Sequence, residues 1–206
     1  MSYCNWDFTF KLYRDYHDKE WGIPLHNDKK QFEFISLEVL QCGLNWKMMM
    51  DKRKIFRKCF NNFNYDLVAE YSQKDIKRIL NTDGMIKSVR KIEAIINNAK
   101  CFQKIRKEFS SFSKYLWAFS DNKTILYDKH ENGFIPASNG LSEQISKDLK
   151  RRGFKYMGAI VVYSHLQACG IINDHDKHCP QYKLINSKYP TVHKKRFLEK
   201  QVFLFE

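Results

Sequence analysis

The sequence predicts an all-α protein. Apolar residues recur three and four positions apart, as on one face of a helix, and no long stretch alternates apolar with polar residues as a half-buried strand does. Glycine and proline are scarce, at 8 and 4 among 206 residues, so few positions interrupt helices. We expect a single domain over residues 1–180, followed by a basic tail of unknown role over residues 181–206.

The first predicted helix starts at Asp28, which can cap it, with Gln31 three residues later as in a capping box. Residues 32–40 are apolar on nearly every face, which is typical of a buried helix. Gly43 can take the left-handed conformation just past the end, and Leu44 can then fold back on the last turn.

Two further helices form a predicted hairpin over residues 72–106 around Gly84. Backbone N–H groups at a helix start bind phosphate, and Lys87, Arg90 and Lys91 add positive charge there. The hairpin is therefore either a contact for a nucleic acid or an ordinary turn with solvated cations.

The second half of the chain contains two more predicted helices. One is capped by Ser142 and ends in the cations of residues 150–152, which the helix dipole favours in a last turn. The other lies in the uncharged run 156–173, whose polar residues suit a buried helix better than a bilayer span. Residues 121–139 are expected to form an irregular loop.

The charge balance points to a polyanionic partner. Lys and Arg number 36 against 23 Asp and Glu, a net charge of +13, which suits a nucleic acid or an anionic membrane surface. We expect no membrane span, and acidic residues near the start argue against an export signal. We therefore expect a reducing, cytoplasmic location, where the six cysteines fill the core or bind metal instead of forming disulfides.

A metal site is one interpretation of the histidines and cysteines. His175 and Cys179 are four apart and share a face if helical, although most such pairs bind nothing. Cys4 and His17 lie near the other terminus, and two Cys with two His make a standard tetrahedral zinc shell. Spacing alone leaves open whether the four meet. Competing ligands are His26, His165 and His178, and the cysteines expected in the core are Cys42, Cys59, Cys101 and Cys169.

Glu38 is the most unusual residue, because it is a carboxylate in the middle of the apolar helix. Burying it is costly unless it is paired, so it is either a structural ion pair or a carboxylate facing a pocket. Around it in sequence lies an aromatic group, either core or a stacking surface for a cationic base: Trp6, Tyr13, Tyr16, Trp21 and Trp46.

Several short motifs occur in order between Cys4 and Cys179. They are Cys4-Asn5-Trp6, Tyr13 with Tyr16-His17-Asp18, Glu20-Trp21-Gly22, Leu37-Glu38, Gly43-Leu44 with Trp46, Arg151-Arg152-Gly153-Phe154-Lys155, and Gln167-Ala168-Cys169-Gly170 with Asn173-Asp174-His175. Together they make the chain resemble the 3-methyladenine DNA glycosylase I family of the helix-hairpin-helix glycosylase superfamily.

The resemblance implies a helix-hairpin-helix fold in which one structural zinc joins the two chain ends. It implies Cys4, His17, His175 and Cys179 as ligands, and Glu38, Tyr16 and Trp46 as lining of a base pocket completed by Tyr13, Trp21 and Trp6. The activity implied is that of a monofunctional enzyme that flips and excises 3-methyladenine from double-stranded alkylated DNA and leaves an abasic site. Glu38 is the candidate catalytic residue, and we expect a monomer.

The chain departs from the family pattern at Phe10-Lys11, Cys42 and Asn45, and the Gly84 hairpin has fewer arginines than usual. Leu44 is either a wedge inserted into opened DNA or the contact that closes a helix end.

Two other classes of function stay open. The first is a zinc-stabilised, non-catalytic nucleic-acid binder, which a salt-bridged Glu38 or a filled pocket would favour. The second is a glycosylase for other lesions, such as oxidised bases. An iron–sulfur cluster is not expected, because there is no closely spaced run of four cysteines.

Overall fold

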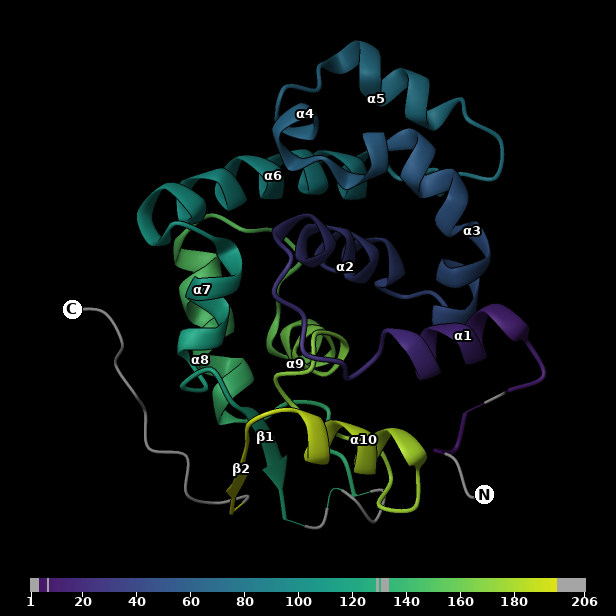
Figure 1. Ribbon diagram of the computed structural model, residues 1–206. Coiled ribbons are helices and arrows are strands. Elements are labelled where there is room, and N and C mark those ends of the chain that lie inside the picture. The colour runs from purple at the N-terminus through teal and green to yellow at the C-terminus, as the bar shows by residue number, and fades with distance from the viewer. Residues whose placement is uncertain (1–3, 7, 129, 131–133, 196–206) are drawn as a thin grey trace.

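The computed structural model describes residues 4–6, 8–128, 130 and 134–195, and it confirms the predicted all-α class (Figure 1). The helices are α1 (Lys11–Lys19), α2 (Asp28–Gln41), α3 (Trp46–Cys59), α4 (Tyr65–Ala69), α5 (Gln73–Leu80), α6 (Val89–Phe109), α7 (Phe112–Ala118), α8 (Gly140–Arg151), α9 (Ala159–Ala168) and α10 (Pro180–Lys188). A short 3₁₀-helix spans Asn61–Phe63, and the strands are β1 (Thr124–Tyr127) and β2 (Thr191–Lys194). Within the described ranges, no helix combines the length and apolar character needed to span a bilayer.

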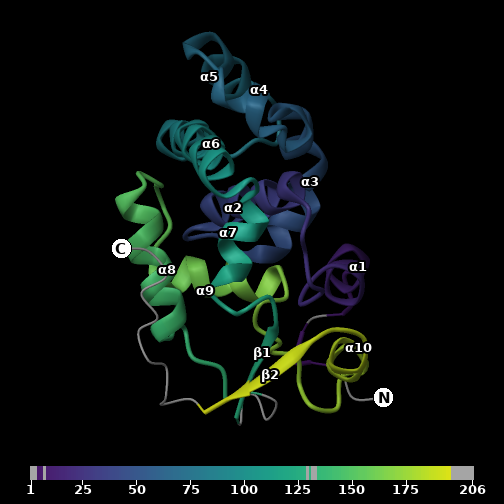
Figure 2. The same cartoon turned by 60° about the vertical axis from the view of Figure 1, so that its left-hand side comes forward.

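Helix α2 lies at the centre of the molecule, with α6 on one side and α9 on the other (Figures 1 and 2). Every residue from Gln31 to Leu40 is buried, as predicted from apolar residues on nearly every face of the helix. The cap differs from the prediction: the side chain of Asn27 accepts from the Lys30 amide, and Asp28 instead accepts from the side chain of Arg106 at 2.8 Å. Asp28 thereby joins α2 to α6.

The C-terminal end of α2 is held by a lysine from α6. Gly43 has φ +77°, so the predicted left-handed residue is confirmed. The ammonium of Lys91 donates to the carbonyls of Leu40 and Cys42, at 2.6 and 2.7 Å. The end of an α-helix leaves such carbonyls without an intrahelical partner. The positive charge of Lys91 also interacts favourably with the negative end of the helix dipole.

A buried guanidinium joins the first three helices. Arg53 on α3 donates to Glu33 on α2 at 2.7 Å and to Glu20, the residue that ends α1, at 2.8 Å. Burial alone would raise the pKa of Glu33, but the guanidinium of Arg53 beside it outweighs burial and lowers that pKa to about 2. Three helices that contribute to the cavity described below are therefore fixed to one another by this network.

Replacing Arg53 with Met is expected to cost about 3 kcal/mol of stability, because the buried Glu33 and the half-buried Glu20 lose their shared guanidinium. Both carboxylates keep Lys30, and Glu33 also keeps Arg57, which limits the loss. A carboxyl group whose pKa is lowered on folding stabilises the fold at pH values above its ordinary pKa, which is 4.5 for Glu33. That stability is lost as the pH falls toward the lowered pKa of about 2. The loss in Arg53→Met, measured by denaturant unfolding, should therefore be largest near neutral pH and shrink below about pH 4.5.

The matched control for this prediction is Arg78→Met. Arg78 makes an exposed ion pair with Asp75 at 3.4 Å, and removing such a pair costs less than about 1 kcal/mol. Equal stability of Arg53→Met and the wild type at neutral pH would refute the prediction.

Two pairs of consecutive helices form hairpins. The predicted one consists of α5 and α6, and its Gly84 has φ +74°, a conformation that other residues rarely adopt. A Cβ at this position would also have to displace Ile55 Cδ1, 2.6 Å away. The other consists of α8 and α9, which pack together across residues 152–158. The cap of α8 is Asn139, and the predicted cap Ser142 is the third helical residue, whose side chain bonds back to the Asn139 amide.

A small sheet corrects two expectations. Residues 121–139, predicted as irregular, contain β1, which pairs in parallel with β2 from the predicted tail (Figure 2). The same tail contains α10, which begins with Pro180 in its first turn. Strands of four residues are too short for an alternating pattern to be recognised in sequence. Residues 196–206 of the predicted tail lie outside the described residues.

Candidate active site and metal centre

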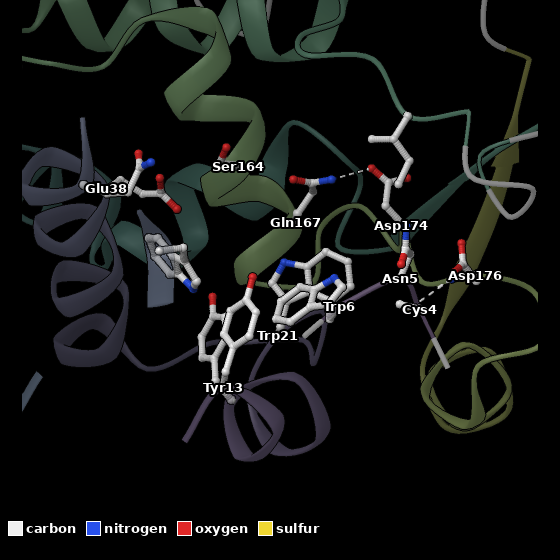
Figure 3. A pocket seen from close by; sticks show the side chains of 14 residues that line it. Cys4, Asn5, Trp6, Tyr13, Trp21, Glu38, Ser164, Gln167, Asp174 and Asp176 are labelled. Carbon is white, nitrogen blue, oxygen red and sulfur yellow. Dashed lines mark hydrogen bonds between the residues drawn. The ribbon is translucent and has the colours of Figure 1, made fainter. Parts of the chain in front are cut away.

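A cavity of about 430 Å³ opens between the N-terminal segment, α1, α2 and α9, a volume typical of pockets for small organic ligands (Figure 3). Its lining comes from both ends of the chain and from its middle. The lining residues are Cys4, Asn5, Trp6, Tyr13, Tyr16, Trp21, Glu38, Gln41, Trp46, Ile135, Ser164, Gln167, Asp174 and Asp176. All six residues predicted for a base pocket are among them.

Glu38 lies in the cavity wall without an ion pair. Its residue is only 4% exposed, and no described residue hydrogen-bonds to its carboxyl group or forms a salt bridge with it. The nearby Arg53 is occupied by Glu20 and Glu33. Burial therefore raises the pKa of Glu38 to about 8. The sequence left two alternatives open for Glu38, a structural ion pair or a carboxylate that faces a pocket. Among the described residues Glu38 forms no ion pair, and it lines the cavity.

Aromatic rings surround the rest of the cavity. Trp6 stacks on Tyr13, with ring centroids 4.6 Å apart and planes 23° apart, and it packs against Trp21 at 4.8 Å. Tyr16 packs against Trp46 at 5.6 Å. Tyr16 is buried, and its pKa is raised by burial and by the neighbouring Glu38 carboxyl. The cavity thus offers flat π surfaces to a planar ligand, with the buried Glu38 carboxyl among them.

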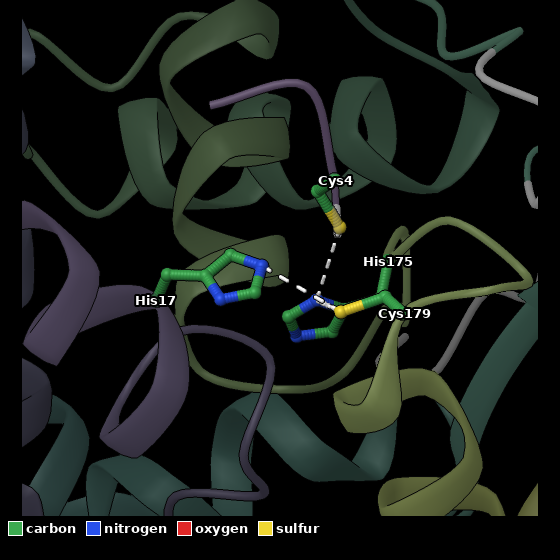
Figure 4. A group of neighbouring side chains, drawn as sticks. All are labelled: Cys4, His17, His175 and Cys179. Atoms are coloured by element: carbon green, nitrogen blue, oxygen red, sulfur yellow. Dashed lines mark hydrogen bonds between the residues drawn. The ribbon is translucent and has the colours of Figure 1, made fainter. Parts of the chain in front are cut away.

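Beside the cavity, Cys4, His17, His175 and Cys179 converge from both ends of the chain (Figure 4). All four are buried, and their ligand atoms lie within 4.8 Å of one another. The Cys4 sulfur lies 3.4 Å from His175 Nδ1, and the Cys179 sulfur lies 3.8 Å from His17 Nε2. Tetrahedral bonds of about 2.0–2.3 Å place such atoms about 3.5 Å apart, so the cluster is able to hold a metal ion.

The surroundings of the cluster orient both imidazole rings. Nδ1 of His17 lies 2.8 Å from the Asp18 carboxylate, and Nε2 of His175 lies 3.1 Å from the Trp21 carbonyl oxygen. A partner on the far ring nitrogen is the usual support of a metal-binding histidine, because it fixes the tautomer. The competing histidines, His26, His165 and His178, are not part of the cluster.

The residues predicted to contact DNA lie outside the cavity lining. Leu44 is half-buried, and its carbonyl accepts from the side chain of Gln41 at 2.6 Å, which links it to the cavity wall. The ammonium of Lys87 donates to the carbonyls of its own hairpin, at Leu80 and Thr82, whereas Arg90 is exposed. Lys91 holds the end of α2, as described above.

Sequence reasoning missed the polar residues of the cavity on α9 and beyond, chiefly Ser164, Gln167 and Asp174. Ser164 and Gln167 are three apart in an otherwise apolar helix, so they share a face, and this spacing was the available signal.

Comparison with known proteins identifies the family of this fold. Residues 6–182 match the family described as methyladenine glycosylase. The chain is 38% identical over 182 residues to DNA-3-methyladenine glycosylase 1 of Escherichia coli (strain K12), covering 88% of this chain and 97% of that protein.

Two solved structures share the fold. A crystal structure of 3-methyladenine DNA glycosylase I superposes with a TM-score of 0.82 at 37% identity, covering 87% of this chain and 98% of that one. A variant of such an enzyme in complex with 3-methyladenine gives 0.79 at 33% identity, covering 85% and 95%. The resemblance found in the sequence is confirmed: the chain belongs to the methyladenine glycosylase family.

Proposed function

We propose that this protein excises 3-methyladenine from alkylated DNA by hydrolysing the N-glycosidic bond, leaving an abasic site. The observation that carries the proposal is the unpaired, buried Glu38 in a cavity walled by aromatic rings. The direct test is incubation with methylated DNA, followed by chromatography of released bases. Release of free 3-methyladenine supports the proposal, and binding to the DNA without release would indicate a non-catalytic binder.

Recognition depends on the positive charge of the lesion. Methylation at N3 makes adenine cationic, and the rings of Trp6, Tyr16 and Trp46 attract a stacked cation. Glu38 is protonated near neutral pH because its pKa is raised to about 8. A cationic base beside Glu38 favours loss of its proton, because the base compensates the charge of the carboxylate. Neutral adenine offers no such compensation, and an ionised carboxylate beside it would be a buried charge without a partner. Normal bases therefore lack the electrostatic part of the binding energy.

The chemistry requires little help in protonating the leaving group. When the bond between sugar C1′ and the base breaks, its electron pair moves onto the cationic base, which leaves as neutral 3-methyladenine. A water oxygen then bonds to C1′ and loses its proton. Glu38 serves as the catalytic residue by holding the base edge, and its ionised form also stabilises the cationic sugar electrostatically.

Access to the base requires the nucleotide to leave the duplex, because a stacked and paired base cannot enter the cavity. We assign the wedge role to Leu44, which its position next to the left-handed Gly43 and its hydrogen bond from the Gln41 side chain support. Lys91 holds this turn through the carbonyl of Cys42. Double-stranded alkylated DNA is accordingly the proposed substrate.

Phosphate contacts are proposed for the α5–α6 hairpin, at Gly84, Lys87 and Arg90. Lys91, also predicted there, contributes by bracing the turn that carries Leu44. The proposal is supported by the exposure of Arg90 and by a net charge of +13 over the whole chain.

DNA affinity is expected to fall steeply with salt, by about one unit of log–log slope for each phosphate contact. Replacing Arg90 with Ala should weaken binding to methylated and unmethylated duplex equally and reduce the slope by about one, because phosphates carry no information about the base. Fluorescence anisotropy at several salt concentrations measures both quantities. A flat salt dependence would contradict the electrostatic interpretation.

The metal that we propose for the Cys4, His17, His175 and Cys179 cluster is zinc. Two thiolates and two imidazoles are a standard zinc shell, and four protein ligands leave no open position for substrate. Such an ion stabilises the fold and takes no part in the reaction. We further propose a monomer acting on chromosomal DNA in the cytoplasm.

A further inference from the structure

We propose that Gln167 is a further catalytic residue, whose side-chain oxygen binds the attacking water, and that Asp174 is the positioning residue that holds its amide in the productive orientation. This inference rests on the proposed function. It concerns the part of the cavity that lies away from Glu38.

The orientation of the Gln167 amide follows from its partner. Asp174 is 2% exposed, and its Oδ2 lies 2.7 Å from the hydroxyl of Tyr163 and 2.9 Å from Nε2 of Gln167. Its Oδ1 lies 2.8 Å from Nδ1 of His130. A carboxylate accepts from all three of these groups, so the amide of Gln167 must direct its nitrogen toward Asp174.

The oxygen of the same amide consequently faces the other way. Figure 3 shows Oε1 of Gln167 directed away from Asp174, toward the side of the cavity where Glu38 lies. No described residue donates a hydrogen bond to this oxygen. It is an oriented acceptor at the surface of the cavity, and an acceptor is what a bound water molecule needs.

The two ends of the cavity differ chemically. Glu38 lies at one end, whereas Asn5 and Asp174 lie at the other, with Gln167 between them (Figure 3). A planar cationic base suits the end with Glu38. The polar end is left for the sugar and for water, and Gln167 is situated where these two parts of the cavity meet.

In the proposed step, the water oxygen bonds to C1′ while the C1′–base bond breaks and its electron pair leaves with the base. Oε1 of Gln167 accepts a hydrogen bond from the water and takes no proton, because an amide is too weak a base. The proton passes from the new hydroxyl group to solvent. The negative end of the amide dipole also faces the developing sugar cation, and the Asp174 carboxylate behind it reinforces this field.

The test is Gln167→Met, which keeps the length of the side chain and removes the amide. Asp174 retains the Tyr163 and His130 contacts, so the fold has reason to persist. The matched control is Gln103→Met, because Gln103 donates to Asp66 at 2.8 Å in the same type of pair on the exposed surface. Gln167→Ala provides a second variant that introduces no new bulk.

Three quantities are measured on each protein: the melting temperature, the affinity for free 3-methyladenine by tryptophan fluorescence, and the single-turnover rate of base release from methylated duplex. Both Gln167 variants should release base about 10- to 100-fold more slowly, the range for one hydrogen bond to a charged or charge-developing group. Their affinity for free 3-methyladenine should stay within about twofold of the wild type, because the base contacts lie elsewhere. Gln103→Met should match the wild type in all three.

Two results would overturn the inference while leaving the proposed function intact. The first is a normal release rate per folded molecule in both Gln167 variants. The second is a parallel loss of free-base affinity and release rate, which would make Gln167 a base contact. Absence of base release by the wild-type protein is the separate result that refutes the proposed function itself, and the role of Gln167 with it.

Discussion

Glu38→Gln is expected to lose excision of 3-methyladenine by ~10²-fold or more, while the fold and nonspecific DNA binding remain. Among the described residues, Glu38 is the only acid at its end of the cavity, and its carboxyl group has no partner. The amide of the introduced glutamine cannot become negatively charged beside the cationic base. Removing one charged contact costs about 3 kcal/mol, which corresponds to a rate loss of roughly two orders of magnitude.

The same substitution has a predictable effect on stability. Burial raises the pKa of Glu38 from its ordinary 4.5 to about 8. A carboxyl with a raised pKa destabilises the fold progressively as pH increases from about 4.5 to about 8, because the unfolded chain ionises first. The amide introduced by Glu38→Gln has no such proton to lose, so the variant should gain stability relative to the wild type over this pH range.

Melting temperature and single-turnover release on one preparation separate function from structure. The control is Glu93→Gln, an exposed glutamate on α6 for which both quantities should stay unchanged. Normal release per folded Glu38→Gln molecule, combined with reduced stability at every pH, would assign Glu38 a structural role and remove it from the site.

Cys179→Ala is expected to abolish stoichiometric zinc binding and to lower the melting temperature by roughly 10 °C or more. Structural zinc contributes several kcal/mol to folding, and each kcal/mol shifts the melting temperature of a chain of this size by about 2–4 °C. Chelation of zinc from the wild-type protein should produce a similar decrease. Metal analysis and calorimetry on the same samples measure both effects.

The matched control is Cys101→Ala, a buried cysteine on α6 outside the cluster. It loses packing and a weak hydrogen bond from the Asn97 side chain, about 1 kcal/mol for a small buried group, and should retain its metal. Wild-type protein purified without chelator that contains no stoichiometric zinc would show that the cluster is held by its own hydrogen bonds alone.

The fold was predictable where apolar residues dominate a helix. Helix α2 and the core of α6 follow directly from their periodicity, because burial on several faces leaves a dense pattern. Helices α1 and α3 escaped prediction because they are rich in charged residues. Only Tyr16 and His17 of α1 are buried, so its pattern contains too few apolar positions to reveal a period.

The site was predictable as chemistry but not as geometry. An acid among apolar residues identified Glu38, and the four-residue spacing suggested His175 with Cys179. The two share the cluster although their segment is a turn before α10 and not the helix that the spacing assumed. That Cys4 and His17 join them depends on contacts across more than 150 residues, which no local pattern encodes. For Lys91 the charge predicted a phosphate contact, and the fold adds a contact that no local pattern indicates, because its ammonium donates to the carbonyl of Leu40 at the end of α2.

The metal cluster and the aromatic wall share one short piece of chain. Cys4 is a member of the cluster and lies two residues before Trp6, which packs on Tyr13 and Trp21. Ordering this segment around a metal therefore also prepares the cavity for a base. Thermodynamic linkage then requires the reverse effect. Binding of 3-methyladenine must raise the affinity for the metal by the same factor by which the metal raises the affinity for 3-methyladenine.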